Sequence, residues 1–311
     1  MDRTAGGTPR SKSPGEAPLL VVVDPVARLT DAESVRIARD VLRAGTPGLK
    51  LCLPDDPTET PRLLARRGAR RPVLVGNDRA LLRAVQHLHG ERALAQTALS
   101  VVPVGNGPSV ALARSLGLPL DAVSAARTVL RGSPRALDLL VDEEDGVVLG
   151  GLRTEGASAG SSRTPPHREG APSAGAASTW RRMSHALART LSSRAHGEAG
   201  ERGAAPPAPA QRAPEVRTVQ WLRVEADGAV VTGPDRPVTD VTVRANGADG
   251  LAEVAVHPVT GGPVRVRARS VTVSAPEGFR YRADTSGCGA PVESRTWTVL
   301  PRAWHLILPA A

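Results

Sequence analysis

Short apolar runs alternate with helix-length amphipathic stretches over the first half of the chain. The run at 19–24, Leu-Leu-Val-Val-Val-Asp, is continuous and β-branched, which is typical of a strand buried on both faces. Further strands are predicted at 51–53, 72–76, 99–104 and 136–142, and helices at 32–45, 61–67, 80–89, 110–116 and 122–131. Thr30 and Glu33 have the spacing of a capping box at the start of the first of these helices. The alternation predicts an α/β domain over 18–145, with a parallel sheet covered on both faces.

The pattern changes to short strands after about residue 146. Asp227 and Gly228 form a tight-hairpin dipeptide between two apolar runs. Strands are predicted at 147–152, 222–226, 229–232, 238–244, 252–256, 264–273, 295–299 and 305–308. Their regular spacing predicts a β-sandwich domain over 146–309. Trp297 and Trp304, at strand positions, are expected to be core residues. Residues 1–17 are predicted to be a disordered tail, and 153–217 a low-complexity basic insertion within the β domain.

The composition of the 311 residues narrows the class of protein. The formal net charge is +9, but all except two of the 40 basic residues are arginine, and 153–217 alone supplies ten arginines against five glutamates. Such arginine usage, with abundant alanine, glycine and proline, is typical of a GC-rich bacterial genome, and a nucleic-acid reader would concentrate its charge on a folded element. We therefore expect no nucleic-acid partner.

The cysteines and histidines do not indicate a metal site or a framework of disulfide bonds. Cys52 and Cys288 are the only cysteines, and the seven histidines lack a metal-binding spacing. No apolar run reaches the roughly 18 residues that a membrane span needs, and the first 17 residues lack the apolar region of a secretory signal. We expect a cytoplasmic protein.

Three loops that follow predicted strands carry candidate chemistry. They are 24–28 (Asp-Pro-Val-Ala-Arg), 75–79 (Val-Gly-Asn-Asp-Arg) and 103–109 (Pro-Val-Gly-Asn-Gly-Pro-Ser). Ligands of open parallel sheets bind beyond the carboxyl ends of the strands, where backbone amides face anions. Each loop taken alone is most simply an ordinary turn after a strand. The order and spacing of the three loops together point more specifically to a family.

The arrangement resembles the diacylglycerol kinase catalytic-domain family, the bacterial lipid kinases. Val-Val-Pro-Val-Gly at 101–105 and Ala-Arg-Ser-Leu-Gly-Leu-Pro at 113–119 resemble the two ends of that family's third motif. The segment at 135–139 resembles its Leu-Asp-Leu strand, 148–151 its entry into the β domain, and 279–309 its returning C-terminal segment. The resemblance covers 18–152 and 219–309. It implies a Rossmann-like α/β nucleotide-binding domain and a β-sandwich.

The resemblance also implies a reaction and a set of site residues. The reaction is phosphoryl transfer from ATP, with Mg²⁺, to the hydroxyl of a diacylglycerol-like lipid in phospholipid metabolism. Asp284 is the candidate base or metal-side carboxylate, with Asp78 and Asp138 in its network. The candidate phosphate cradle is formed by Gly76, Asn77, Gly105, Asn106 and Gly107. Arg79 or Arg28 is added on other grounds, because the geometry of a guanidinium suits it to neutralise phosphate charge.

The motifs depart from the family at several of these positions. Gly-Asn-Asp-Arg-Ala at 76–80 stands where the family has Gly-Gly-Asp-Gly-Thr, and Asp24 replaces the asparagine of its first loop. The third loop is two residues longer, and Asp-Thr-Ser at 284–286 replaces Asp-Gly-Glu. A second hypothesis follows: a catalytically inactive relative that binds nucleotide or lipid as a regulatory module. A homodimer is left open.

One segment of the insertion has the pattern of a basic amphipathic helix. Over 179–196, Trp180, Met183, Leu187 and Leu191 share one helical face, and arginines occupy the rest. Such a helix can lie in the interface of an anionic membrane, which predicts peripheral contact with the inner membrane face. The alternative is that its apolar stripe docks on the β domain.

Overall fold

The computed structural model describes residues 18–155, 219–245, 249–284 and 289–310. The predicted tail at 1–17 and the predicted helix at 179–196 lie outside these residues. Arg153 was expected to open the low-complexity insertion, but it belongs to the strand β7 (Leu152–Glu155). None of the helices in the described ranges is long and apolar enough to cross a membrane.

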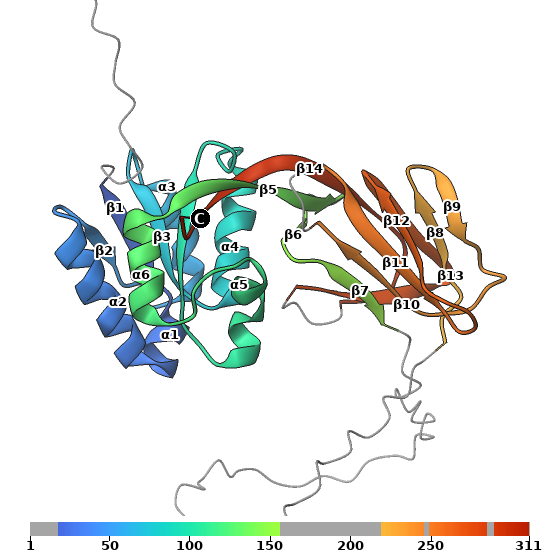
Figure 1. Cartoon of the computed structure of the whole chain (residues 1–311), viewed down its shortest axis with the longest axis horizontal. Coiled ribbons are helices and arrows are strands. Elements are labelled where there is room, and N and C mark those ends of the chain that lie inside the picture. The colour runs from blue at the N-terminus through green and yellow to red at the C-terminus, as the bar shows by residue number, and fades with distance from the viewer. Residues whose placement is uncertain (1–17, 156–218, 246–248, 285–288, 311) are drawn as a thin grey trace, which may run out of the picture. The chain divides into compact units, whose positions relative to one another are not determined.

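The first half of the chain forms the expected parallel sheet (Figure 1). Four strands pair in the order β4-β3-β1-β2. These strands are β1 (Leu19–Val23), β2 (Lys50–Cys52), β3 (Arg71–Gly76) and β4 (Ala98–Pro103). The helical elements are α1 (Pro25–Thr30), α2 (Ala32–Gly45), η1 (Pro57–Glu59), α3 (Thr60–Ala65), α4 (Asp78–Gly90), η2 (Gly107–Val110), α5 (Ala111–Ser115) and α6 (Ala122–Arg131).

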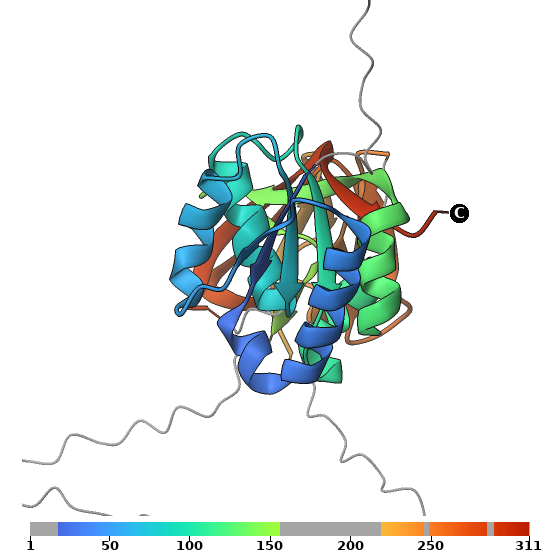
Figure 2. The same ribbon diagram turned by 90° about the vertical axis from the view of Figure 1, so that its left-hand side faces the viewer.

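Both faces of this sheet are buried, as the β-branched run of β1 predicted. Leu19 and Val21 pack in one cluster with side chains of α2 and α6. Leu20 and Val22 point the other way, into a cluster that includes α4 and α5. Successive side chains of a strand alternate in direction, so a run that is apolar throughout supplies both clusters. Figure 2 shows helices on the two sides of the sheet.

The start of α2 differs from the capping box that the sequence suggested. Its cap is Asp31, whose side chain accepts a hydrogen bond from Ser34 N at 3.0 Å. Thr30 instead closes α1, because its hydroxyl donates to the carbonyl of Val26 at 2.8 Å. A carboxylate one residue further along takes over the capping role, since aspartate at this position is at least as good a cap as threonine.

The second half is largely the expected set of antiparallel strands, and it completes the α/β plus β-sandwich architecture. The strand predicted at 136–142 is the exception: it was expected in the parallel sheet, but it pairs antiparallel with the last strand of the chain and with the strand at Val147–Val148. The strands are β5 (Ser133–Asp142), β6 (Val147–Val148), β7, β8 (Arg223–Ala226), β9 (Ala229–Thr232), β10 (Val238–Arg244), β11 (Ala252–Pro258), β12 (Val264–Ala268), β13 (Ser270–Ala283) and β14 (Val292–Leu308). Neighbouring strands pair in the order β12-β11-β10-β7-β13-β14, and β8 pairs with β13 and β9.

Three strand boundaries differ from the prediction. The run 147–152 is divided between β6 and β7, and the run 264–273 is divided between β12 and β13. The two short strands expected at 295–299 and 305–308 are one strand, β14, with a register shift between Leu300 and Trp304. Apolar runs locate strands, but a bulge or a corner inside a run depends on the partner strands and leaves little trace in the sequence.

The strand β14 joins the two sheets. It pairs with β13 on one side, with β5 along most of its length, and in parallel with β4 near its end. Trp297 and Trp304 are both fully buried on this strand, as expected, in different core clusters. The hydrogen-bonded network is therefore continuous from the parallel sheet into the antiparallel strands.

Candidate functional site

The carboxyl ends of β1, β3 and β4 bring the three predicted loops to one edge of the sheet. Asp24 N donates to the Val75 carbonyl at 2.9 Å, and Val104 N donates to the Gly76 carbonyl at 2.9 Å. Each loop then begins a helical element, so the edge presents the starts of α1, α4 and η2. This is the edge where open α/β sheets bind phosphate-bearing ligands.

The loop after β3 is closed tightly by its own side chain. Asn77 caps α4, and its Oδ1 accepts a hydrogen bond from Ala80 N at 3.1 Å. Gly76 is buried, and a Cβ added there would lie 3.0 Å from the Cβ atoms of both Asp24 and Ala80. Arg79 is exposed beside them. Gly76 is thus required for the packing of β1 against α4, whatever else the loop does.

The loop after β4 lies beside the first. A Cβ on Gly105 would lie 3.6 Å from the Cβ of Asn77 and 2.3 Å from Oγ of Ser109, and the φ of Gly105 is +151°. Asn106 caps η2 through Ser109 N at 3.1 Å. Gly107 is exposed, with open space where a Cβ would be. The five predicted cradle residues are therefore gathered by two adjacent loops.

An ion pair that sequence reasoning missed completes this edge. The carboxylate of Asp24 is fully buried, accepts Val26 N at 2.8 Å, and pairs with Nη2 of Arg83 at 2.5 Å. Arg83 lies on α4, 59 residues further along the chain. Only the parallel pairing of β1 with β3 brings the two together, so no local pattern could have indicated the pair.

Asp78 is the first residue of α4, and its carboxylate holds the next helix in place. It is buried, and its oxygens accept hydrogen bonds from Leu112 N at 2.8 Å and Ala113 N at 3.0 Å. These are amides in the first turn of α5, where acceptors of backbone N–H groups are needed. Burial raises the pKa of Asp78 above its ordinary value, and the two amide donors act in the opposite direction.

Asp284 follows β13 and clamps the segment between β6 and β7. Its oxygens accept hydrogen bonds from Leu149 N and Gly150 N at 2.7 Å and from Gly151 N at 3.0 Å. Its own N–H donates to the Gly151 carbonyl at 2.9 Å, and its φ is 47°. Burial raises the pKa of Asp284, against the three amide donors, and the negative charge of Asp78 adds to the rise.

Asp78 and Asp284 meet through α5. A Cβ added at Gly150 would lie 2.8 Å from Cδ1 of Leu112 and 3.1 Å from Oδ1 of Asp284. Leu112 therefore contacts the segment that Asp284 holds, while its own N–H donates to Asp78. The structure thus brings together two of the three predicted acids, which come from distant parts of the chain.

Asp138 has different partners. Its oxygens accept Gly250 N and Arg302 N, both at 2.8 Å, and its carbonyl accepts the indole N–H of Trp304 at 3.2 Å. These contacts hold the irregular part of β14. Among the described residues, no hydrogen bond or ion pair joins Asp138 to Asp78 or Asp284, and its contacts give it a structural role.

Backbone amides at 149–151 are functional groups that sequence reasoning missed. The segment Leu149–Gly150–Gly151 was interpreted as the entry to a strand, whereas its three consecutive N–H groups bind the Asp284 carboxylate. The paired glycines are the signal that could have indicated it. Gly151 has a φ of +149°, and a Cβ there would lie 2.6 Å from the Val243 carbonyl oxygen.

The described residues do not form a protein-held site for the Mg²⁺ that the resemblance implies. They contain no group of three or more His, Cys, Asp or Glu side chains that could hold a metal ion. The oxygens of Asp78 and Asp284 already accept backbone N–H groups. These two carboxylates are therefore engaged by the backbone and are not arranged as metal ligands.

Comparison with known proteins identifies the fold. No protein-family model matches the sequence, and no curated protein does either. A solved structure of a diacylglycerol kinase from Bacillus anthracis matches with a TM-score of 0.61 at 13% identity, covering 94% of this chain and 96% of that one. The chain has the diacylglycerol kinase fold.

A second solved structure widens the comparison. An NAD kinase from Archaeoglobus fulgidus, in complex with ATP, matches with a TM-score of 0.50 at 13% identity over 93% of this chain and 92% of that one. Both solved structures therefore share the fold of this chain, and the low identity agrees with the departures from the family motifs noted at 76–80 and 284–286. Within the diacylglycerol kinase fold, the three loops and Asp284 are the residues to test.

Proposed function

We propose that this chain is a lipid kinase that binds ATP at the loops around Asn77 and Gly105 and transfers its terminal phosphoryl group to a lipid hydroxyl. The observation that carries the proposal is the pairing of Asp284 with Asp78 through α5. Two acids from opposite halves of the chain are held near each other by backbone amides. The ATP-bound NAD kinase and the diacylglycerol kinase with related folds support the nucleotide and the acceptor class.

In this proposal Asp284 is the general base. The acceptor hydroxyl gives its proton to the Asp284 carboxylate as its oxygen forms a bond to the terminal phosphorus, and the bond from that phosphorus to ADP breaks. The raised pKa of Asp284 makes its ionised form a stronger base than an exposed aspartate. The exposed guanidinium of Arg79, beside the cradle, would neutralise phosphate charge.

A second candidate function has its own supporting observation. The oxygens of Asp78 and Asp284 already accept five backbone hydrogen bonds. The N–H of Ala80, at the start of α4, already donates to the side chain of Asn77. A catalytically inactive module that binds nucleotide or lipid would keep these structural contacts without a free base. The two candidate functions are distinguished by catalytic turnover, which the kinase has and the inactive module lacks.

The test is phosphoryl transfer by the full chain from labelled ATP, with magnesium, to diacylglycerol in mixed micelles. We expect labelled lipid from the wild type, and a fall in turnover of roughly 10²–10⁴-fold in Asp284→Asn. The matched control is Asp227→Asn. Asp227 also has a positive φ, of 49°, and its Oδ1 accepts two backbone amides, Arg269 N and Ser270 N, in a hairpin remote from the three loops.

The pH profile of kcat/KM distinguishes a catalytic base at Asp284 from a purely structural residue. As the base, Asp284 makes kcat/KM fall when the pH drops through its raised pKa, above the ordinary 3.8. Wild-type turnover in Asp284→Asn would remove this residue from the mechanism. The inactive module would be favoured by two results together. The wild type would transfer no phosphate to several lipids from either ATP or GTP, and ATP would still raise its melting temperature.

A lipid acceptor also requires contact with a bilayer. The sequence offers the basic amphipathic stretch 179–196, outside the described residues, for this contact or for docking on the β strands. Co-sedimentation with anionic liposomes separates the two. Binding that falls with salt and in Trp180→Ala/Leu187→Glu supports the membrane contact, whereas binding unaffected by deletion of 179–196 contradicts it.

A further inference from the structure

The strand β12 (Val264–Ala268) lies at one end of the strand order β12-β11-β10-β7-β13-β14. It pairs antiparallel with β11 on one side, and no strand within the described ranges pairs with it on the other. In an antiparallel pair, every second residue directs its N–H and carbonyl groups away from the partner strand. We call this unpaired side the open edge of β12. It offers main-chain hydrogen bonds to a further strand.

The apolar side of β12 is incompletely covered. Val264 and Val266 stand opposite two valines of β11 that are at most 1% exposed in the core. Val264 belongs to the same layer of side chains but is 44% exposed. Val259, in the turn between β11 and β12, is also 44% exposed. A strand added at the open edge could therefore bury apolar side chains of its own beside Val264 and Val266.

The opposite side of β12 carries arginines that face solvent. The side chains of Arg265 and Arg267 are 67% and 55% exposed. Arg267 pairs with Asp249, whereas Nη1 of Arg265 lies 4.0 Å from Oε1 of Glu253. Glu253 also stands opposite Arg267 and opposite the exposed Arg244 of β10. Three guanidinium groups thus share two carboxylates here, and each guanidinium has further N–H groups with which to bind another carboxylate.

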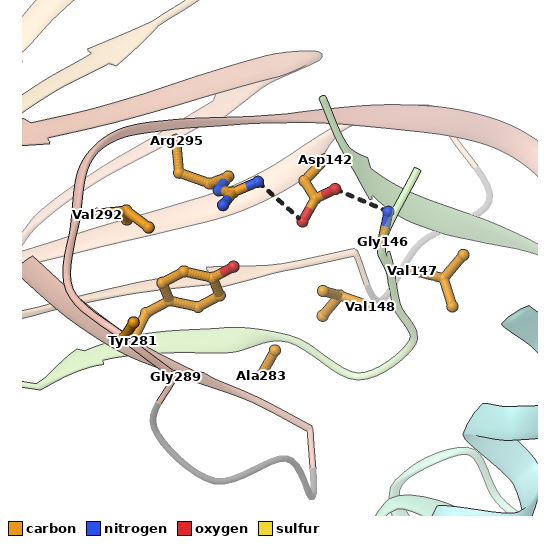
Figure 3. A pocket seen from close by; sticks show the side chains of 10 residues that line it. Asp142, Gly146, Val147, Val148, Tyr281, Ala283, Gly289, Val292 and Arg295 are labelled. Atoms are coloured by element: carbon orange, nitrogen blue, oxygen red, sulfur yellow. Dashed lines mark hydrogen bonds and ion pairs between the residues drawn. The ribbon is translucent and has the colours of Figure 1, made fainter. Parts of the chain in front are cut away.

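A buried arginine elsewhere among the antiparallel strands shows the contrast. Arg295 borders a cavity of about 340 Å³ among β5, β6, β13 and β14 (Figure 3). Its Nη1 lies 3.1 Å from Glu144 and 3.7 Å from Asp142. These two carboxylates already balance its charge, so this guanidinium is not available to a ligand. The arginines of β12 remain accessible to a partner.

The arginines disfavour a second copy of this chain as the added strand. A twofold antiparallel pair of β12 strands would keep the arginines of both copies on one face, where like charges repel each other across the strand pair. Charged side chains on edge strands are a means by which proteins prevent such self-pairing. A partner strand with acidic residues on this face would instead form opposite-charge pairs with Arg265 and Arg267.

We propose that the open edge of β12 binds an extended acidic segment of another protein by strand addition. Alternate residues of the bound segment are acidic and contact Arg265 and Arg267, and the residues between them are apolar and lie beside Val264 and Val266. Main-chain hydrogen bonds supply affinity, and the alternation of side chains supplies selectivity. The inference does not depend on the proposed kinase activity, because binding at β12 needs neither nucleotide nor turnover.

The test uses a fluorescein-labelled peptide, Glu-Val-Glu-Val-Glu-Val, titrated with the full chain and followed by fluorescence anisotropy. We expect saturable binding. The peptides Lys-Val-Lys-Val-Lys-Val and Glu-Glu-Glu-Val-Val-Val should bind at least about tenfold more weakly, because they lack the charge or the alternation. Hydrogen–deuterium exchange locates the contact. The amides of 264–268 should exchange more slowly when the acidic peptide is bound, because those at the open edge gain acceptors.

Charge reversal at the edge separates strand addition from general attraction. Arg265→Glu should weaken binding of the acidic peptide at least about tenfold, since one strand spacing of about 5 Å separates β12 from the bound segment. The matched control is Arg244→Glu, which makes the same charge change on the same face. It lies three strand spacings, about 14 Å, from the bound segment. That distance exceeds the screening length of about 10 Å at 0.1 M salt, so binding should stay within about twofold of wild type. If Arg265→Glu lowers the melting temperature, Arg265→Gln takes its place.

Several results would overturn the inference. They are the absence of saturable binding, equal binding of either control peptide, unchanged exchange at 264–268, and equal weakening in Arg265→Glu and Arg244→Glu. Competition by a thymidine hexanucleotide that is also lost in Arg265→Glu would identify a phosphate-binding surface and contradict strand addition. Sedimentation of the peptide-free chain as a dimer whose β12 amides are already protected would assign the edge to a second copy and contradict it as well.

Discussion

At the scale of single residues, the carboxylates carry both structure and candidate chemistry. Asp24, Asp78, Asp138 and Asp284 each accept backbone N–H groups, and three of the four are fully buried. A charged acceptor satisfies amide donors better than a neutral one and costs more to lose, because the amides are then left without partners. Substitutions at these positions therefore need both a stability and an activity readout.

Asp78→Asn should destabilise the fold by about 1–3 kcal/mol, because an amide can accept from only one of Leu112 N and Ala113 N.

The pKa of Asp78 is raised in the folded state, so its titration favours folding at low pH. That contribution is lost as the pH rises from the unfolded value of 3.8 through the raised folded pKa. Urea unfolding at several pH values should show the stability gap between wild type and variant narrowing across this window as the pH rises. A gap that widens would contradict the assignment.

Substitution of two glycines of the cradle should affect the melting temperature differently. Gly76→Val should lower the melting temperature, because its Cβ would lie 3.0 Å from the Cβ atoms of Asp24 and Ala80. Gly107→Val has open space and should leave the melting temperature unchanged while reducing the rise that ATP produces. Thermal melts with and without ATP check both. An ATP-induced rise that is the same in Gly107→Val as in wild type would exclude this position from the nucleotide site.

At the scale of elements, one side chain of α4 is hydrogen-bonded to the turn between β5 and β6. Gln86 Nε2 donates to the Asp145 carbonyl at 2.8 Å, and its Oε1 accepts from Val147 N at 3.0 Å. The same helix begins with Asp78, and the same turn leads to the segment that Asp284 clamps. Gln86 therefore connects the helix that begins with Asp78 to the turn that precedes the segment held by Asp284.

Gln86→Leu should remove both hydrogen bonds and speed amide exchange at Val147, while the core of α4 keeps its protection. If the proposed kinase activity holds, kcat should fall with little change in KM for ATP, since the cradle is untouched. Gln86→Glu, which keeps the acceptor, should retain the protection of Val147 better than Gln86→Leu. Unchanged exchange at Val147 in Gln86→Leu would contradict the role of this contact.

At the scale of the whole molecule, the continuous pairing of β4, β14, β5 and β13 links the two kinds of sheet. A strand of 17 residues that pairs in both cannot separate from one sheet without disturbing the other. Calorimetry of the full chain should therefore show a single main unfolding transition. Trp304→Ala, which opens a cavity in the parallel half, should cost about 3–5 kcal/mol and shift that transition as a whole. Two separate transitions, only one of them shifted, would contradict this coupling.

The sequence by itself determined the α/β and β organisation, the parallel pairing of the first four strands, and the loops at the strand ends. It could do so because periodicity, β-branched runs and turn dipeptides act within a few residues of each other. Asp78, Asp284 and the glycine loops were identified as candidates, by resemblance to a family whose fold the chain has.

Only the tertiary structure decided what those residues contact. It pairs Asp24 with Arg83, places α5 between Asp78 and Asp284, and brings Asp138 to the irregular stretch of β14. The hydrogen bonds accepted by the side chains of Asp78 and Asp138 come from residues 34 to 164 positions away along the chain. Contacts at such separation follow from strand pairing and register, and a buried carboxylate looks the same in sequence whether it binds a backbone amide or takes a proton from a substrate.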